Sequence, residues 1–284
     1  MKKNFFLVFG ILVLFYLNGC SSTYIFSHHP QLSERYYLIK VKKALKKAEK
    51  NPTNSEYLFQ AQKLLTQYGY AFQLEEAERY LYKNIFLSKK AYENASKSFI
   101  KAVEYGKNNL RIFYPEIDKW LLNPKNKKII FNPKHVAYLY WTAASIGGLI
   151  KSSKGAPETI VLFPQIGFLL KQALEINPAW DNGAIFTALI SYSMSEYPLT
   201  DEKKKNVKTY FDEVIKYSEG KSAAPYVTYA ESVSVKAQDR EEFIYLLNQA
   251  LVISYTENDE LNLENHISQI RAKWLLSRID ELFY

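Results

Sequence analysis

The chain has 284 residues, 48% of them hydrophobic and 15% aromatic, with a formal net charge of +8. This composition excludes an intrinsically disordered chain, which buries too little apolar surface to offset the entropy lost on ordering, and ten glycines with ten prolines are too few for a loop-rich all-β protein. The basic residues are scattered along predicted helices, which is typical of solvated helix faces and indicates no nucleic-acid partner.

The first residues have the pattern of a lipoprotein signal peptide. Lys2 and Lys3 precede an apolar run from Phe5 to Leu17, which is shorter than the ~20 residues that a membrane-spanning helix needs. The run ends in the motif Leu-Asn-Gly-Cys, whose Cys20 is the single cysteine of the chain and therefore excludes an internal disulfide. We predict that lipid is attached to Cys20; the alternative is an ordinary signal peptide or N-terminal membrane anchor in which this cysteine is incidental.

Processing at this motif divides the chain into three parts. Residues 1–19 are the expected signal peptide, residues 20–32 the lipidated cysteine with a short tether, and residues 33–284 a helical domain. More than one acyl chain on Cys20 is needed to hold a protein stably at a bilayer. Ser21 favours the outer membrane in bacteria that sort lipoproteins by the second residue of the processed chain.

The remaining sequence has the hydrophobic periodicity of α-helices and almost none of strands. Apolar residues recur at i, i+3, i+4 and i+7 in several segments, for example from Val207 to Val214 and from Phe243 to Ala250. We predict an all-α, TPR-like helical repeat array of about eleven antiparallel helices.

Helix boundaries are predicted from turn and capping residues. Thr200 and Asp239 are expected N-caps, and Gly106 and Gly220 are expected to close two helices. Asn-Pro steps mark further boundaries because Asn tolerates the left-handed conformation and Pro cannot continue a helix. These steps are Asn51-Pro52, Asn123-Pro124, Asn132-Pro133 and Asn177-Pro178.

Weak internal repeats suggest stacked helix pairs. The segment Ala173 to Pro178 matches the end of a tetratricopeptide repeat, in which the second helix closes with an Ala-Leu step. Generic helical packing is the alternative. The expected pairs are 37–50 with 54–68, 181–192 with 202–218, and 223–236 with 240–253.

Two stretches contain candidate ligand-lining or pore-lining residues, because concave faces of helical arrays with aromatic side chains favour ligands. Adjacent glycines inside a helix cost ~1 kcal/mol each against Ala, which indicates either close helix packing or room for a ligand. Tyr226 and Tyr229 are one helical turn apart and could line one cleft, although they could instead be core residues. The candidates are Tyr138, Trp141, Gly147 and Gly148 in the first stretch and Tyr226 and Tyr229 in the second.

The sequence contains no recognisable catalytic or metal-binding pattern, so we predict no enzyme activity, no cofactor and no metal site. The four histidines have no metal-ligand spacing, and no nucleophile elbow or phosphate-binding glycine loop is present. The acidic pairs Glu75-Glu76 and Glu241-Glu242 are typical of solvated helix starts.

Several blocks resemble the TatT component family, tetratricopeptide-like lipoproteins associated with TRAP transporters. The resemblance covers most of residues 20–284 and rests on the order and spacing of the blocks, but it fails in the Lys- and Asn-rich segment 107–131. The blocks are Gln67 to Phe72, Ala137 to Ile150, Ala173 to Pro178, Pro225 to Ser232, Gln238 to Arg240 and Arg271 to Phe283.

The resemblance implies a periplasm-facing lipoprotein of the bacterial envelope that can form homotrimers with apolar cavities or pores. It also implies a partner, the periplasmic solute-binding protein of a TRAP transporter, and a small hydrophobic or organic-acid ligand. The sequence therefore predicts a transport accessory; the alternative is a TPR-type envelope scaffold that binds other proteins without a transported ligand.

Overall fold

A computed structural model describes residues 30–284 except 127, 197–199 and 255–260. Cys20, the predicted signal peptide and most of the predicted tether lie outside the described residues.

The described residues form helices and no strand, which confirms the predicted all-α class. The longer helices are α3 (Pro30–Lys50), α4 (Ser55–Tyr68), α6 (Ile85–Phe113), α8 (Val136–Ser152), α10 (Phe163–Ile176), α11 (Ala184–Ser195), α12 (Asp201–Tyr217), α15 (Arg240–Val252) and α16 (Asn262–Leu276). Shorter segments are α5 (Glu75–Tyr80), α7 (Ile117–Leu122), α9 (Pro157–Ile160), α13 (Ala224–Tyr229), α14 (Val235–Ala237) and α17 (Ile279–Leu282), the 3₁₀ turns η2 (Pro133–His135) and η3 (Trp180–Gly183), and the π-helical segments η1 (Gly69–Leu74) and η4 (Ala230–Ser234).

Most predicted boundaries are confirmed, but the conformation predicted for the Asn-Pro steps is wrong. Asn123, Asn132 and Asn177 lie at helix boundaries with extended rather than left-handed backbone, because the residue before a proline is restricted to the extended region. The side chain of Thr200 accepts a hydrogen bond from the backbone N–H of Lys203, and that of Asp239 accepts one from Glu242, so both are N-caps. Gly220 follows α12 with φ of +69°, the left-handed conformation expected after a helix.

The prediction that Gly106 closes a helix is wrong, because α6 continues through it to Phe113. A Cβ at this position would lie 2.0 Å from Nε2 of Gln62 and 2.7 Å from Oγ1 of Thr142. Glycine is therefore required here by the close approach of α4 and α8, and its lower helix propensity is offset by that packing.

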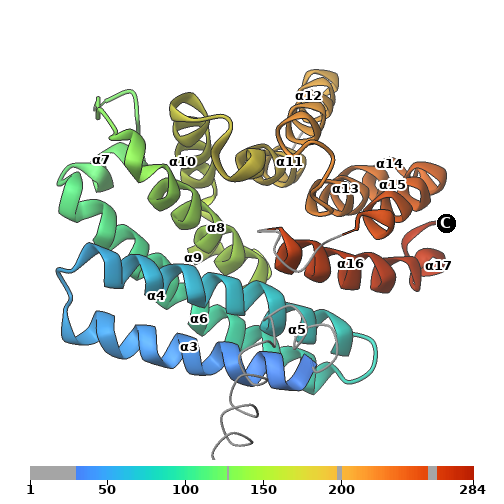
Figure 1. Cartoon of the computed structure of the whole chain (residues 1–284), viewed down its shortest axis with the longest axis horizontal. Coiled ribbons are helices and arrows are strands. Elements are labelled where there is room, and N and C mark those ends of the chain that lie inside the picture. The colour runs from blue at the N-terminus through green and yellow to red at the C-terminus, as the bar shows by residue number, and fades with distance from the viewer. Residues whose placement is uncertain (1–29, 127, 197–199, 255–260) are drawn as a thin grey trace, which may run out of the picture.

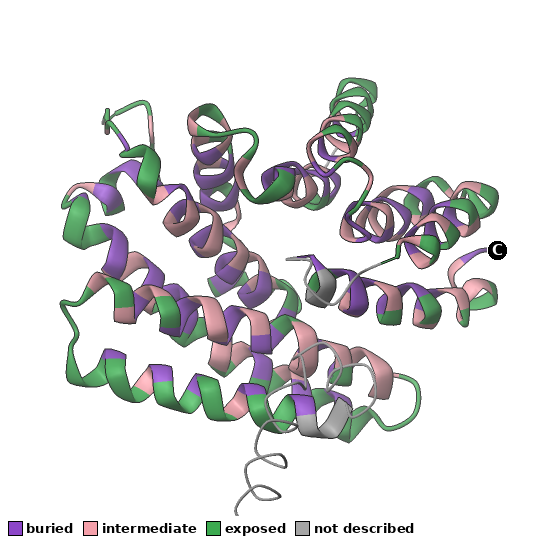
Figure 2. Ribbon diagram, viewed as in Figure 1, coloured by how far each residue is buried: buried purple, intermediate pink, exposed green. Residues whose placement is uncertain are grey.

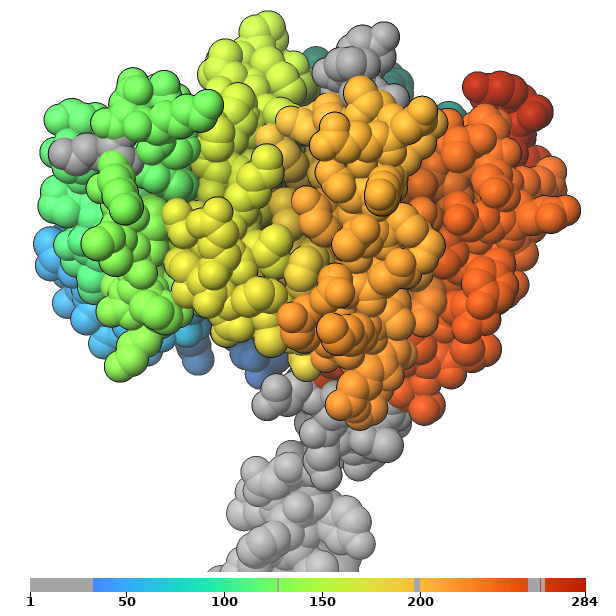
Figure 3. All heavy atoms as spheres, turned by 90° about the horizontal axis from the view of Figure 1, so that it is seen from above, coloured from blue at the N-terminus to red at the C-terminus, as the bar shows by residue number. Residues whose placement is uncertain are grey.

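Consecutive helices pack as antiparallel pairs, and the pairs predicted at 37–68, 181–218 and 223–253 are present as α3 with α4, α11 with α12, and α13–α14 with α15 (Figure 1). Seen from above, the chain follows this order across the molecule, from green through yellow to orange (Figure 3). The first helix of the middle pair begins at Ala184 rather than Asp181, because Asp181 and Asn182 have φ of +49° and +54°. The repeat character of the array stays a prediction.

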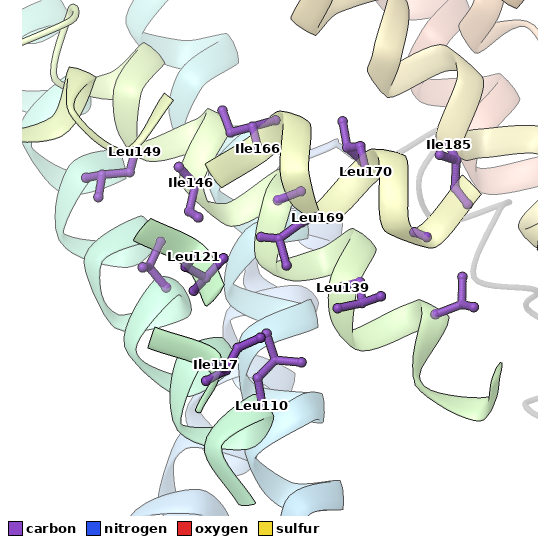
Figure 4. Packing of buried hydrophobic residues seen from close by; sticks show 14 of the residues in the cluster. Leu110, Ile117, Leu121, Leu139, Ile146, Leu149, Ile166, Leu169, Leu170 and Ile185 are labelled. Carbon is purple, nitrogen blue, oxygen red and sulfur yellow. The ribbon is translucent and has the colours of Figure 1, made fainter. Parts of the chain in front are cut away.

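The core lies between the helix layers and forms two large clusters. Side chains from α6, α7, α8, α10 and α11 point toward one another in the first (Figure 4), and α11, α12, α13, α15 and α16 contribute to the second. Buried residues lie where helices face each other, and the outward faces are exposed (Figure 2). The segment Pro157–Ile176 is apolar and long enough to cross a membrane, but Leu169, Leu170 and Ala173 are buried in the first cluster, so core packing explains its composition.

Two long helices contain a π-helical segment. The segment η1 lies between α4 and α5, and η4 lies between α13 and α14. A π-helical segment changes the direction in which the following side chains point and is frequent at functional sites. Glu75 follows η1 directly and Glu231 lies within η4, and both carboxylates take part in the cluster described below.

Candidate functional site

Of the predicted residues on α8, Tyr138 and Trp141 are half-buried and both contact α4. The Tyr138 ring packs against Phe59 and His135, with centroids 4.9 and 5.0 Å away. Trp141 lies toward α4, where Nζ of Lys63 is 5.4 Å from its ring centroid. Phe59 and Lys63 are one turn apart on α4, so both aromatic residues lie along the contact between α8 and α4.

The two adjacent glycines of α8 also differ. A Cβ on Gly148 would lie 2.1 Å from Cε1 of the fully buried Phe99, so this glycine permits close packing of α8 on α6. A Cβ on Gly147 would have its nearest neighbour, the hydroxyl oxygen of Tyr70, at 3.3 Å. Gly147 is therefore the glycine that borders accessible space.

Tyr226 and Tyr229 both pack against Phe211 of α12, with ring centroids 5.5 and 4.8 Å away. They belong to the second core cluster, whereas Tyr138 packs against the first. Burial raises the pKa of Tyr229 to about 12, with Glu242 and Asp212 adding to the effect. The structure thus divides the predicted residues between two regions of the molecule.

A different surface, which we call the inner face, runs along α8. Tyr140, Ala144, Gly147 and Lys151 are spaced at i, i+4, i+7 and i+11, so they form one stripe on the helix. The hydroxyl of Tyr70 in η1 donates a hydrogen bond of 3.0 Å to the carbonyl oxygen of Ala144. The opposite side of α8 carries the buried residues Thr142, Ser145 and Leu149.

Residues from other parts of the chain complete the inner face. The ring of Trp180 in η3 lies 4.7 Å from that of Tyr140. Burial raises the pKa of Tyr140, and the charges of Glu264 on α16 and Asp181 on η3 raise it further. Burial likewise raises the pKa of Glu264, which accepts a hydrogen bond from Ser222 at 3.0 Å.

Groups on the inner face are surrounded by protein and still accessible to water. Burial raises the pKa of Tyr70 to about 12, yet 38% of this residue is exposed. Burial acts to lower the pKa of Lys151, but Glu231 and Glu78 outweigh it and raise the pKa, while 46% of the lysine side chain stays exposed. These groups are therefore surrounded by neighbouring side chains and remain accessible to small molecules from the solvent.

One end of the inner face is closed by a six-residue ion cluster that joins the two halves of the chain. Arg271 of α16 contacts Glu75 at 3.0 Å, Glu78 at 2.5 Å and Glu231 at 2.5 Å. Lys151 contacts Glu78 at 2.8 Å, and Arg79 contacts Glu75 at 3.0 Å. The cluster consists of Arg79, Lys151 and Arg271 with Glu75, Glu78 and Glu231.

The close contacts within the ion cluster shift the pKa values of its members. The Arg271 side chain is only 11% exposed, and although burial acts to lower its pKa, Glu231 and the other carboxylates raise it. Burial acts to raise the pKa of Glu78, but Lys151 and Arg271 hold it below its usual range. Three cations face three carboxylates, so the cluster is balanced and stabilises the juxtaposition of α5 and α16. The interpretation of Glu75 as part of a solvated helix start is therefore wrong.

Trp274 extends the cluster on α16. The guanidinium carbons of Arg271 and Arg278 lie 4.4 and 5.1 Å from its ring centroid, within the range of cation–π attraction. Chemically, the inner face offers aromatic rings, a half-exposed ammonium group at Lys151 and the carboxyl group of Glu264, which suits a small ligand with an apolar body and one polar end. Among the described residues no group of three or more His, Cys, Asp and Glu side chains has an arrangement that could hold a metal ion.

A second depression, on the outer surface, lies between α7, the segment after it and α10. It is lined by Trp120, Ile129, Phe131 and the polar side chains of Gln172 and Glu175. None of the residues predicted from the sequence lines it. We therefore take the inner face, which contains the predicted Gly147, as the candidate site.

The sequence also matches known proteins. The sequence model of the family described as "TRAP transporter T-component" matches residues 37–283. A protein of Treponema pallidum (strain Nichols), described only as an uncharacterized protein, is 21% identical over 242 residues, which is 82% of this chain and 74% of the relative.

Proposed function

Since the chain belongs to the TRAP transporter T-component family, we propose that it binds the periplasmic solute-binding protein of a TRAP-type transport system as an accessory of that system in the bacterial envelope. The family match over residues 37–283 is the observation that carries this proposal. Docking of a partner needs a rigid body, and the antiparallel pairs with their two core clusters are consistent with one.

The proposal includes a ligand at the inner face. Tyr140 and Trp180 would contact its apolar part, and the ammonium group of Lys151 would attract a carboxylate if the ligand is an organic acid. Because Lys151 is already paired with Glu78, a carboxylate ligand would have to share this lysine, which favours weak and reversible binding over tight storage.

Anchoring is the third part of the proposal. Acyl chains on Cys20 would hold the protein at a membrane, the outer membrane being favoured by Ser21, with the helical domain facing the periplasm. The role is binding rather than catalysis. A homotrimer, which the family resemblance allows, is the proposed assembly.

A second function, that of an envelope scaffold without a transported ligand, is favoured by one observation. Tyr226 and Tyr229 pack on Phe211, and Gly148 packs on Phe99, so several of the residues predicted to line a cavity are in close contact with neighbouring side chains. A scaffold would bind proteins through its outer helical faces and leave the inner face empty.

Two measurements on the natively purified protein test these functions. Titration with the purified solute-binding protein should give saturable binding, and absence of binding at high micromolar concentration would contradict the transport role. Native mass spectrometry should show a co-purified small molecule and the number of subunits. Lys151→Gln should reduce the bound fraction if the ligand is an organic acid, and Lys171→Gln, at an exposed position on α10, is the matched control. A protein that binds its partner and never contains a small molecule would support the scaffold.

A further inference from the structure

The turn between α5 and α6 exposes an unusual concentration of apolar side chains. Tyr82 is 71% exposed, Ile85 55%, Phe86 82% and Leu87 43%, and we call these four residues the apolar turn. The turn is well defined, because the side chain of Asn84 caps α6 by accepting hydrogen bonds from the backbone N–H groups of Phe86 and Leu87, both at 3.1 Å. Large exposed apolar side chains on a capped turn indicate a surface that is covered by something else.

The charged residues of the chain segment that forms the apolar turn are all positive, although Arg278 of the C-terminal region, which lies 4.1 Å from the Tyr82 ring, is itself paired with Glu281. From residue 79 to residue 92 the sequence contains one arginine and three lysines and no acidic residue. Lys83, Lys89 and Lys90 are exposed and flank the apolar side chains on both sides. Aromatic and aliphatic side chains mixed with lysines are the composition that enters the interface of a membrane with anionic lipids.

The position of the turn in the fold points to the same partner. The start of α3 packs beside the end of α4 and η1, since Tyr68 donates a hydrogen bond of 3.0 Å to Glu34 and the rings of Tyr37 and Phe72 are 5.7 Å apart. The apolar turn and the start of α3 therefore lie at the same end of the molecule, in teal and blue (Figure 1). Pro30 follows Cys20 by ten positions, and ten residues span at most ~35 Å even when fully extended.

We propose that the apolar turn inserts into the headgroup region of an anionic membrane and orients the helical body as a second point of attachment beside the N-terminal anchor. The inference rests on the proposed anchoring, and it is independent of the transport partner. A second copy of this chain related by a two-fold axis is a poorer occupant, because that contact would bring the same positive charges together, and a head-to-tail contact between copies is an outcome of the test below. Loss of the three lysines should weaken the partitioning of the turn into an anionic membrane about a hundredfold.

The test uses the full-length chain produced in a host that processes lipoproteins and reconstituted into phospholipid vesicles. An environment-sensitive fluorophore is attached to Phe86→Cys, and the matched control is Leu122→Cys, which is 78% exposed at the end of α7, far from the turn (Figure 1). Quenching by lipids that carry a nitroxide near the headgroup measures contact with the membrane. The chain without an added cysteine, treated in the same way, reports whether the thiol of Cys20 is blocked.

We expect strong quenching at position 86 and little at position 122 in vesicles containing phosphatidylglycerol, and loss of the quenching when Lys83, Lys89 and Lys90 are all replaced by Gln. Equal and low quenching at both positions would overturn the proposal. So would quenching at position 86 that is unchanged in phosphatidylcholine vesicles and in the triple variant, because the charge argument would then be wrong.

Two further outcomes separate this inference from the other proposals. Emission at position 86 that shifts with protein concentration in detergent, without lipid, would assign the turn to a contact between copies and overturn the membrane contact. The other outcome is that the fluorophore labels Cys20 in the chain without an added cysteine and no protein floats with the vesicles. That result would overturn both the proposed lipid anchor and the proposed second attachment. Neither measurement depends on binding of the solute-binding protein.

Discussion

The adjacent glycines of α8 allow a sharp test of the packing, because the same substitution should have opposite effects at two consecutive positions. Replacing Gly by Ala inside a helix raises stability by about 0.5–1 kcal/mol when the new methyl group meets no obstacle. At Gly147 the nearest atom to a new Cβ is the hydroxyl oxygen of Tyr70 at 3.3 Å, at the end of a side chain that is 38% exposed. Tyr70 needs to move by only a few tenths of an ångström, so Gly147→Ala should be neutral or stabilise by up to about 1 kcal/mol.

At Gly148 the new Cβ would lie 2.1 Å from Cε1 and 2.4 Å from Cζ of Phe99. The ring of Phe99 is fully buried between helices and has no free space to move into. Overpacking of this kind costs about 1–3 kcal/mol, which exceeds the gain in helix propensity. Gly148→Ala should therefore lower the free energy of unfolding by about 1–2 kcal/mol.

Thermal unfolding followed by far-UV circular dichroism measures the difference. For a chain of this size each kcal/mol shifts Tm by about 2–4 °C, so the two variants should melt several degrees apart. Phe99→Leu provides the control, because a shorter side chain at position 99 should make Gly148→Ala less costly than it is beside the phenylalanine. A Gly148→Ala protein that melts at or above the temperature of Gly147→Ala would refute the packing argument.

Three further predictions follow from contacts in the fold. Gly106→Ala should lower the free energy of unfolding by about 1–3 kcal/mol because its Cβ would lie 2.0 Å from Gln62, and an unchanged denaturant midpoint would show that Gln62 moves aside. Asp239→Ala should cost about 1 kcal/mol in the same assay through loss of the cap on α15, whereas Asp239→Asn should keep most of it. Because Arg271 and Lys151 hold the pKa of Glu78 below its usual value of 4.5 against the opposing effect of burial, this carboxyl group stabilises the fold fully above pH 4.5 and loses its contribution as the pH falls through the lowered pKa. Arg271→Met should lower Tm at neutral pH and make Tm less dependent on pH below 4.5, and an unchanged acid profile would contradict the role of the cluster.

Local features of the fold could be predicted from the sequence because they depend on neighbouring residues. The caps at Thr200 and Asp239 act on backbone groups three residues away. The Asn-Pro steps at Asn123 and Asn177 follow helices because proline holds the residue before it in the extended region, not through the left-handed conformation that was predicted. Gly106 shows where this reasoning stops. A glycine that ends a helix and a glycine that admits another helix have the same local sequence signal, and only the contact with Gln62 decides between them.

The candidate site was predictable only in part, for the same reason. The spacing of Tyr140, Ala144, Gly147 and Lys151 was available in the sequence as one helical stripe, although the glycine of the pair that faces accessible space could not be identified without Phe99 and Tyr70. The aromatic candidates were chosen because aromatic side chains often line ligand sites. The residue type alone does not determine whether a side chain lies on the core side of its helix or on the accessible side. This explains why Tyr226 and Tyr229 pack on Phe211 rather than joining the residues of α8.

The ion cluster lies beyond any local pattern, because Arg271 and Glu75 are 196 positions apart. Their contact depends on the curvature accumulated over all the intervening helix pairs, and on the π-helical segments that precede Glu75 and contain Glu231. The cluster therefore fixes the distance between α5 and α16, and with it the width of the inner face. If a ligand occupies that face, Arg271→Met should change ligand binding as well as Tm, because the same contact sets both.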